Sequence, residues 1–205
     1  GSTDVALLWA TGRTWMRVPE TIRVDIQGRF RPGIDAKDLA LKLGREMTIA
    51  GATYAALEYH GLEWLPLPGR QTLASMAVEL GAKAGMIPPS GEVAEHFDVP
   101  DWLFIDPQAV YARRLNIDLD TLEPQVALPH AVDNVVDIST IAGTPVTEVF
   151  LGTCTNGRYE DLYTAAEIMR GKQTHPDVRL IVTPASRQEL QRAIADDTLS
   201  TLLQA

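Results

Sequence analysis

Residues 147–171, TEVFLGTCTNGRYEDLYTAAEIMRG, contain an apolar strand-like run, a polar loop and a helix-like pattern in direct succession. Residues 177–197, DVRLIVTPASRQELQRAIADD, repeat this order with a second apolar run and a second helix-like pattern. Ser186 and Glu189 have the spacing of a capping box at the start of the second helix. A strand–helix–strand–helix order is typical of a parallel sheet with right-handed crossovers. The two segments therefore predict an α/β fold.

The first 130 residues alternate between strand-like and helix-like patterns as well. Alternating Ile22, Val24 and Ile26 indicate a half-buried strand, and Asp35 is a good cap for the helix that follows it. The expected elements are a short helix that ends near residue 10, strands near 21–30, 53–61 and 115–126, and helices near 35–52 and 72–87. The helix near 72–87 carries one apolar stripe, made of Leu73, Met76, Ala77, Leu80 and Ala84.

The chain is expected to consist of three parts. Residues 1–17 are predicted to be the tail of a preceding domain, residues 18–130 an α/β middle domain, and residues 131–205 the first part of a second α/β/α domain. The polar, proline-bearing stretch EPQVALPHAVDN (123–134) marks the expected boundary. The chain begins without Met and stops at Ala205 without a turn or cap, so we expect a piece of a longer protein.

The composition excludes several classes of protein. A net charge of −9 argues against nucleic acid and against an anionic membrane surface as partners, because both require a basic face. No apolar run has the roughly 18–20 residues of a membrane span, and no secretion signal is recognisable. The single cysteine excludes an internal disulfide and fits a reducing compartment, so a cytoplasmic location is expected.

The single cysteine, Cys154, lies in the loop between the strand and the helix of the first segment. Ligands of open parallel sheets bind beside the carboxyl ends of the strands. A thiol just before a helix N-terminus is favoured as the thiolate, so we expect it to ionise below its usual pKa of about 8.5. A lone cysteine is more commonly a small buried hydrophobe, and a redox-sensing thiol is a third interpretation. The residues alone leave all three open.

The sequence FLGTCTNGRYEDL around the cysteine resembles the first cluster-cysteine motif of the aconitase superfamily. Within it, the resemblance is strongest to the large subunits of the two-subunit dehydratases, the 3-isopropylmalate dehydratase and homoaconitase group. Residues 1–24, EYHG (58–61), GRQTLASMAVELGAKAG (69–85) and RLIVTPASRQ (179–188) are similar to further segments of that group. The resemblance therefore extends over nearly the whole chain and implies aconitase-type three-layer α/β/α domains with parallel or mixed sheets.

The resemblance implies a hydro-lyase that moves a hydroxyl between adjacent carbons of 2- and 3-isopropylmalate in leucine biosynthesis. Homoaconitase, or another aconitase-type hydro-lyase of a hydroxy-polycarboxylate, is the alternative within the class. The resemblance further implies a [4Fe–4S] cluster held by three cysteines, with one open iron that acts as a Lewis acid. Cys154 matches the first ligand, and the other two are expected beyond Ala205. The chain alone is therefore expected to be inactive.

Two further residues match positions near the open iron. Glu79 matches a family glutamate, and a carboxylate there can exchange a proton with iron-bound water. Ser75 stands where the family usually has asparagine, which puts the contact at this position in doubt. The i, i+4 spacing places Ser75 and Glu79 on one side of the predicted helix. Without the resemblance, Glu79 would be interpreted as a solvated helix residue.

Thr155, Asn156 and Arg158 follow the cysteine as in the family motif, and the resemblance places them in the environment of the substrate or cluster. Asn156 is expected to hydrogen-bond near the cluster or to cap the helix. Arg158 is expected to pair with a substrate carboxylate or with Glu160 or Asp161, and the structural pairing is the preferred interpretation.

The resemblance also implies partners. They are a small subunit that carries a swivelling domain with the catalytic serine base, and a small hydroxy-acid substrate. A non-catalytic scaffold or a redox-sensing module is the alternative from another class. RNA binding, which occurs among some aconitase relatives, is disfavoured by the charge of −9.

Overall fold

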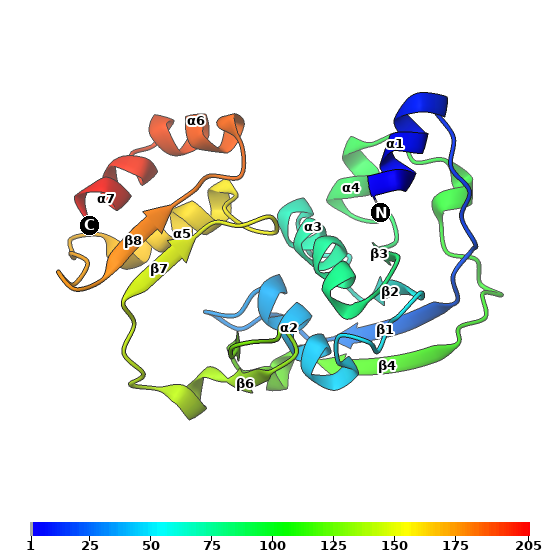
Figure 1. The fold of residues 1–205 in the computed structure, drawn as a ribbon, viewed down its shortest axis with the longest axis horizontal. Coiled ribbons are helices and arrows are strands. Elements are labelled where there is room, and N and C mark those ends of the chain that lie inside the picture. The colour runs from blue at the N-terminus through cyan, green and yellow to red at the C-terminus, as the bar shows by residue number, and fades with distance from the viewer. Residues whose placement is uncertain (1) are drawn as a thin grey trace.

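The structure is a computed structural model and describes residues 2–205. Figure 1 shows two groups of elements that are joined by residues 142–147, which contain no helix or strand. We call residues 2–141 the first unit and residues 142–205 the second unit. Each unit has its own cluster of buried apolar side chains, between Ile22 and Leu122 in the first and between Leu162 and Leu202 in the second.

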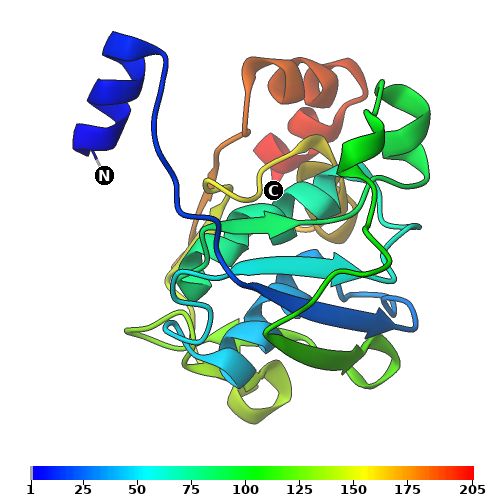
Figure 2. The same ribbon diagram turned by 90° about the vertical axis from the view of Figure 1, so that its right-hand side faces the viewer.

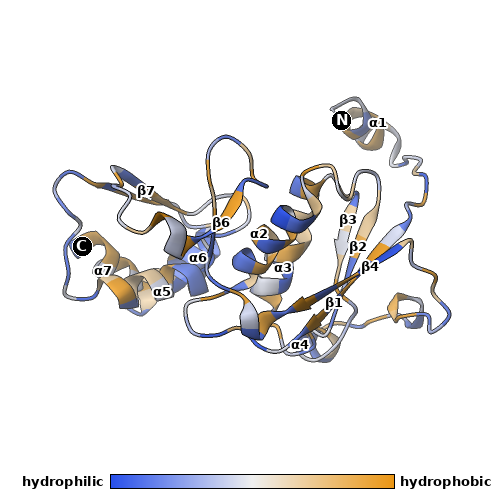
Figure 3. Ribbon diagram, turned by 90° about the horizontal axis from the view of Figure 1, so that it is seen from below, coloured by the Kyte–Doolittle hydropathy of each residue, from blue (hydrophilic) through white to orange (hydrophobic). Residues whose placement is uncertain are grey.

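The first unit is built on a parallel sheet, sheet A, whose strand order is β3-β2-β1-β4. In β1, Ile22, Val24 and Ile26 are buried and the residues between them are half-buried, as the alternation predicts. Helices α2 and α3 lie on one side of the sheet and cover this apolar face (Figure 3). The α/β class and the parallel sheet are confirmed, whereas a helical layer on the opposite face stays a prediction. The bounds are β1 Thr21–Gln27, α2 Ala36–Met47, β2 Ala56–His60, α3 Leu67–Met76, β3 Ala84–Met86 and β4 Arg113–Asp118.

Helix α2 begins where its cap predicts. Oδ1 of Asp35 accepts from the backbone N–H of Lys37 at 2.7 Å, and Oδ2 of Asp38 accepts from the N–H of Asp35 at 2.9 Å. This reciprocal pair is a capping box, so the helix start satisfies donors that would otherwise lack partners.

The helix predicted over residues 72–87 has different bounds. Helix α3 ends at Met76 and continues as a 3-10 turn, η1 (Ala77–Leu80). Gly81 then has φ +81°, a left-handed conformation that favours glycine and ends the helix. Ala84 was predicted on the helical stripe but lies in β3, because the edge of β2 offers backbone partners that side-chain periodicity does not report. The rest of the stripe is buried as predicted: Leu73, Met76, Ala77 and Leu80.

The strand predicted over residues 115–126 is split in two. After β4 the chain makes a 3-10 turn, η3 (Leu119–Thr121), and then forms β5 (Gln125–Ala127). Strand β5 pairs antiparallel with β6 (Val135–Asp137), and this hairpin packs on α2. The domain division at residue 130 falls between these two strands and stays a prediction. The remaining short elements are α4 Glu92–His96, η2 Asp101–Leu103 and η4 Ile138–Ile141.

The second unit has the predicted order of strand, helix, strand and helix. Strands β7 (Glu148–Leu151) and β8 (Arg179–Val182) are parallel, with α5 (Tyr159–Met169) between them in the sequence. Helices α6 (Arg187–Ala195) and α7 (Thr198–Gln204) follow β8. The helices bury Leu162, Ala166, Ala193 and Leu202 against one another and against the strands.

Helix α1 (Ser2–Thr11) stands apart from the rest of the first unit (Figure 2). None of its described side chains is buried, and Trp9 is 84% exposed. Within residues 2–205, no helix combines the length and apolarity that crossing a bilayer requires.

Candidate functional site

The loop between β7 and α5, residues 152–158, is named here the cysteine loop. Its ends are fixed against the end of β8. The N–H of Thr183 donates to the carbonyl of Leu151 at 2.8 Å, and the N–H of Ala185 donates to the carbonyl of Gly157 at 2.7 Å. A Cβ on Gly157 would lie 2.7 Å from the carbonyl oxygen of Thr183, and the glycine has φ +83°. Only glycine meets both the conformation and the close approach.

Cys154 lies at the tip of this loop and is exposed. The interpretation of Cys154 as a small buried hydrophobe is therefore wrong. Thr153, directly before it, has φ +114°, which is unfavourable for a residue with a branched side chain. Such backbone strain is maintained only where surrounding contacts fix it, and it is concentrated at functional sites. The thiol is thus presented at the carboxyl end of β7, where the sheet argument predicts a ligand site.

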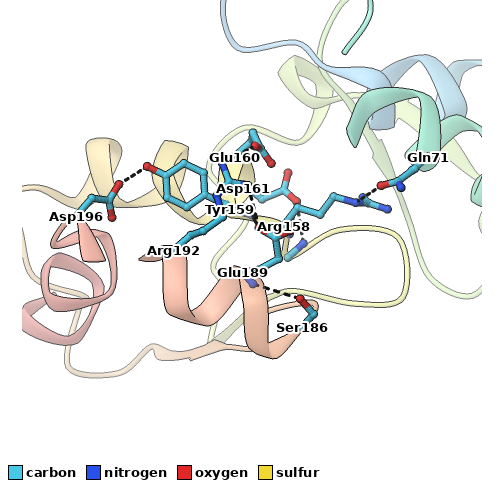
Figure 4. Close-up of polar contacts among 10 residues, drawn as sticks. Gln71, Arg158, Tyr159, Glu160, Asp161, Ser186, Glu189, Arg192 and Asp196 are labelled. Atoms are coloured by element: carbon cyan, nitrogen blue, oxygen red, sulfur yellow. Dashed lines mark hydrogen bonds and ion pairs between the residues drawn. The ribbon is translucent and has the colours of Figure 1, made fainter. Parts of the chain in front are cut away.

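The N-terminus of α5 is occupied by carboxylates of the chain itself. Oδ2 of Asp161 accepts from the N–H groups of Gly157 at 2.8 Å and Arg158 at 3.0 Å. Oε2 of Glu189 accepts from the N–H of Tyr159 at 2.9 Å (Figure 4). These N–H groups donate to carboxylates, so the expectation that this helix N-terminus serves the thiolate of Cys154 is not met.

The capping box predicted for α6 is only half formed. Oγ of Ser186 accepts from the N–H of Glu189 at 3.2 Å, as the spacing predicts (Figure 4). The Glu189 carboxylate does not return the bond to Ser186, because it lies against the start of α5 and accepts from Tyr159. The sequence predicts that Glu189 caps its own helix, whereas in the structure its carboxylate connects α6 to the start of α5.

Arg158 points away from its own helix towards α3. Its Nε donates to Oε1 of Gln71 at 2.9 Å (Figure 4), and its Nη1 donates to Oγ1 of Thr72 at 3.3 Å and to the carbonyl of Thr155. The side-chain pairings predicted with Glu160 or Asp161 are therefore wrong. The guanidinium has a structural role, but across the two units and not within α5.

Asn156 neither caps α5 nor reaches the first unit. Its Nδ2 lies 3.3 Å from Oδ1 of Asp161, and its Oδ1 accepts from the hydroxyl of Thr155 at 3.0 Å. The amide therefore links the tip of the cysteine loop to the carboxylate that caps the helix.

Thr155 is 5% exposed, in contrast to its neighbour Cys154. Nζ of Lys37 donates to its hydroxyl at 3.1 Å, and Oγ1 of Thr72 donates to its carbonyl at 3.2 Å. Beside these bonds, a cavity of about 270 Å³ separates the two units. It is lined by the first turns of α2, α3 and α5, and among others by Phe30, Lys37, Trp64, Thr72, Asn156 and Arg158.

Ser75 and Glu79 are both exposed, and neither lines this cavity. Thr72, Ser75 and Glu79 follow one another at intervals of three and four, so Ser75 lies one turn beyond the contact with the cysteine loop. The expectation of a common helical face needs a correction. Residues 77–80 form a 3-10 turn, and its steps of about 120° rotate Glu79 roughly 60° further around the axis than an α-helix would.

Two carboxylates near the start of α5 have shifted pKa values. Burial raises the pKa of Asp35 above its usual value, and the carboxylates of Asp38 and Asp161 act in the same direction. At the other side of α5, the hydrogen bond from the Tyr159 hydroxyl lowers the pKa of Asp196 and raises the pKa of the tyrosine.

The donor set for a metal group is incomplete in this chain. Cys154 is its one cysteine. In the part of the chain that the structure describes, no three His, Cys, Asp or Glu side chains are grouped so that they could hold a metal ion. Sequence reasoning missed Lys37, Gln71, Thr72 and Thr183 as neighbours of the loop, because each belongs to an element distant in sequence and carries no local signal for this contact.

Comparison with known proteins agrees with this architecture. The model of the aconitase family (aconitate hydratase) matches residues 1–144 and 139–205. The chain is 51% identical over 205 residues to a 3-isopropylmalate dehydratase large subunit of Herpetosiphon aurantiacus, and 52% identical over 208 residues to a homoaconitase large subunit of Thermus thermophilus. Each alignment covers 100% of this chain, and 48% and 50% of the respective relatives.

A 3-isopropylmalate dehydratase large subunit 1 of Deinococcus radiodurans is 47% identical over 207 residues, with 100% of this chain and 48% of the relative covered. The chain thus spans about half the length of the relatives that it matches. The strength and extent of these matches place it with them: the chain belongs to the aconitase family.

Proposed function

We propose that the protein containing this chain is a hydro-lyase of the 3-isopropylmalate dehydratase type, in which Cys154 is one ligand of a [4Fe–4S] cluster. The observation that carries the proposal is the exposed thiol of Cys154 on a loop whose ends are fixed against β8, at the carboxyl end of a parallel strand. The similarity of about 50% to dehydratase and homoaconitase large subunits over the whole chain supports it.

The residues present fit one corner of such a cluster. Iron–sulfur clusters are held by cysteine thiolates, and the exposure of Cys154 leaves its sulfur free to bind. Because the chain has a single cysteine, two further thiolates must come from residues that this chain does not contain. When bound, a cluster with one open iron supplies a Lewis acid that makes hydroxide a feasible leaving group.

The side chains of this chain then have distinct tasks. The exposed carboxylate of Glu79 is suited to hold and release a proton during hydration and dehydration. Ser75 has a hydroxyl that can donate to a substrate oxygen. Thr72 supports this placement, because its bond to Thr155 holds the cysteine loop one turn away on the same helix. Thr155 and Asn156 shape the loop around Cys154.

Arg158 is a positioning group in this proposal. Its guanidinium donates to Gln71, Thr72 and the carbonyl of Thr155, so it is engaged with the protein and is not directed to a substrate carboxylate.

The proposed substrate is a small hydroxy-dicarboxylate, 2- or 3-isopropylmalate, in leucine biosynthesis. Homoaconitate is the alternative, because relatives of both names match equally well. The relatives are named large subunits, which supports a small subunit, with a swivelling domain, as partner. The proposed location is the cytoplasm, because a free thiol fits a reducing compartment.

A redox-sensing scaffold is the second candidate, favoured by the same exposed thiol. It needs neither iron nor the small subunit, and this difference separates the two candidates.

The test uses the full-length protein with its small subunit, reconstituted anaerobically with iron and sulfide. Hydration of isopropylmaleate, cis-homoaconitate and cis-aconitate is followed side by side, and the preferred acid identifies the reaction. We expect Cys154→Ser to abolish turnover, and Ser139→Ala, an exposed residue of η4, to leave it unchanged. Absence of turnover with all three acids in the iron-loaded wild type would exclude the hydro-lyase and favour the redox-sensing scaffold.

A further inference from the structure

The two units are connected through very few polar contacts. Apart from the bonds of Thr144 to the carbonyl of Ile141, where the chain passes from one unit to the other, every hydrogen bond between the two units in residues 2–205 involves Thr155 or Arg158. The partners in the first unit are Lys37 at the start of α2, and Gln71 and Thr72 on α3. The connecting residues 142–147 are exposed and contain no helix or strand, so they do little to fix the orientation of the second unit.

These contacts hold Thr155 from two sides. On its side chain, Lys37 donates to the hydroxyl at 3.1 Å. On its backbone, Thr72 donates to the carbonyl at 3.2 Å and Arg158 donates to the same oxygen. A buried threonine with both polar groups satisfied has one defined position. Cys154 is the preceding residue, so that position also determines where the thiol lies.

The ends and the tip of the cysteine loop are therefore held by different parts of the molecule. The ends are fixed within the second unit by the bonds of Leu151, Gly157, Thr183 and Ala185. The tip is fixed by the first unit through Thr155. A change in the contact between the units would move the tip while the ends stay in place.

We propose that Lys37 and Arg158 are positioning residues that clamp Thr155 and so hold Cys154 next to the face of α3 that carries Ser75. The clamp makes the docking of the two units a condition for a correctly placed thiol. The proposal rests on the proposed function in taking Cys154 as a ligand, but the clamp itself is testable in the iron-free protein.

The experiment uses the 205-residue chain by itself, after circular dichroism has verified that it folds. Cys154 is its only thiol, so a nitroxide label attaches to this position alone. The electron paramagnetic resonance spectrum of the labelled, iron-free chain reports the mobility of the loop tip. We expect restricted motion in the wild type, a mobile component in Lys37→Met, and restoration in Lys37→Arg, which keeps the donor. Lys42→Met is the matched control, because Lys42 lies on the same helix and pairs with Glu46 instead.

A second measurement avoids the label. Hydrogen exchange of the amides of residues 152–158 is compared in the unlabelled wild type, Thr155→Val and Thr155→Ser. Loss of the hydroxyl should speed exchange about fivefold to tenfold, the effect of one hydrogen bond of ordinary strength, and serine should restore protection. A merely structural effect would speed exchange throughout the second unit and lower the unfolding midpoint without this local pattern.

Equal label mobility in wild type, Lys37→Met and Lys42→Met, together with unchanged exchange in Thr155→Val, would overturn the clamp. If one of these variants does not fold, Lys37→Ala or Thr155→Ala takes its place, with the same expectation of a mobile label or faster exchange. The experiments distinguish a failure of the clamp proposal from a failure of the hydro-lyase proposal. A mobile label in Lys37→Met with full cluster binding in Cys154→Ser would contradict the proposed function alone.

Discussion

Oγ1 of Thr72 donates a hydrogen bond of 3.2 Å to the carbonyl oxygen of Thr155, although 83 residues separate the two in sequence. This bond joins helix α3 to the loop that carries the only thiol. Both threonines are buried, at 4% and 5% exposure, so the bond is shielded from water. The candidate site therefore depends on a contact between two units with separate apolar cores.

Thr72→Val should weaken this contact with little change in side-chain volume. The carbonyl oxygen of Thr155 would still accept from Arg158, so the loss of this one bond is expected to lower the free energy of unfolding by about 1 kcal/mol. Urea denaturation followed by circular dichroism measures this difference. Thr3→Val, at an exposed position of α1, serves as the control. A loss in Thr72→Val no larger than in Thr3→Val would show that the bond does not contribute.

Gly157→Ala should be among the most damaging single substitutions in the cysteine loop. The new Cβ would approach the carbonyl of Thr183 to 2.7 Å, and the residue would keep φ +83°. Overpacking and left-handed strain together are expected to cost about 2–4 kcal/mol.

Gly143→Ala is the matched control for Gly157→Ala, because its φ is +87° but nothing lies within 4 Å of the added Cβ. Only the strain of about 1 kcal/mol is expected there. Equal unfolding free energies for the two variants would mean that the close approach to Thr183 is not a constraint.

Glu189→Gln should destabilise the start of α5. The carboxylate accepts from the N–H of Tyr159 at 2.9 Å, where the helix dipole favours a negative charge. We expect a loss of about 0.5–1 kcal/mol at low ionic strength that shrinks in 1 M salt. Glu167→Gln, near the other end of α5, should show no such loss beyond its surface pair with Arg170. A loss that does not depend on salt would argue against the electrostatic explanation.

Asp35 should contribute a pH dependence of known sign. Its pKa is raised in the folded state because surrounding protein atoms desolvate the carboxylate, although the residue as a whole is exposed to solvent. The folded protein therefore binds this proton more tightly than the unfolded chain does. The stability that the group contributes is present below its usual pKa of 3.8 and is lost as the pH rises through the raised value.

Unfolding of wild type and Asp35→Asn is measured from pH 3.5 to 7 to test this sign. The stability of wild type relative to Asp35→Asn should fall as the pH increases over that window. Asp177→Asn, at a side chain that is 90% exposed, is the surface variant with which this slope is compared. A difference for Asp35→Asn that grows with pH would contradict the direction of the shift.

Local sequence patterns predicted the elements but not their tertiary partners. The βαβα order of the second unit, the cap of α2 by Asp35 and the alternation in β1 each follow from residues that are neighbours in sequence. The strand β3 was missed because its three residues look like the end of an amphipathic helix, and only the edge of β2 makes them a strand.

The same distinction holds for the candidate site. The position of Cys154 in a loop at the end of a strand was predictable from the order of elements. Its exposure beside a buried Thr155 was not, because Lys37, Gln71 and Thr72 reach the loop from 83 or more residues away. The contact of Glu189 with the N-terminus of α5 was not predictable either, because a capping pattern in the sequence does not show that the carboxylate binds another helix.

The most direct test of the account is cluster binding by Cys154. The full-length protein with its small subunit is reconstituted anaerobically with iron and sulfide, and iron and acid-labile sulfide per chain are measured with the visible absorption spectrum. We predict a stable cluster in the wild type and in Ser139→Ala, and its loss in Cys154→Ser. Unchanged iron, sulfide and absorption in Cys154→Ser would contradict the assignment of this thiol as a cluster ligand.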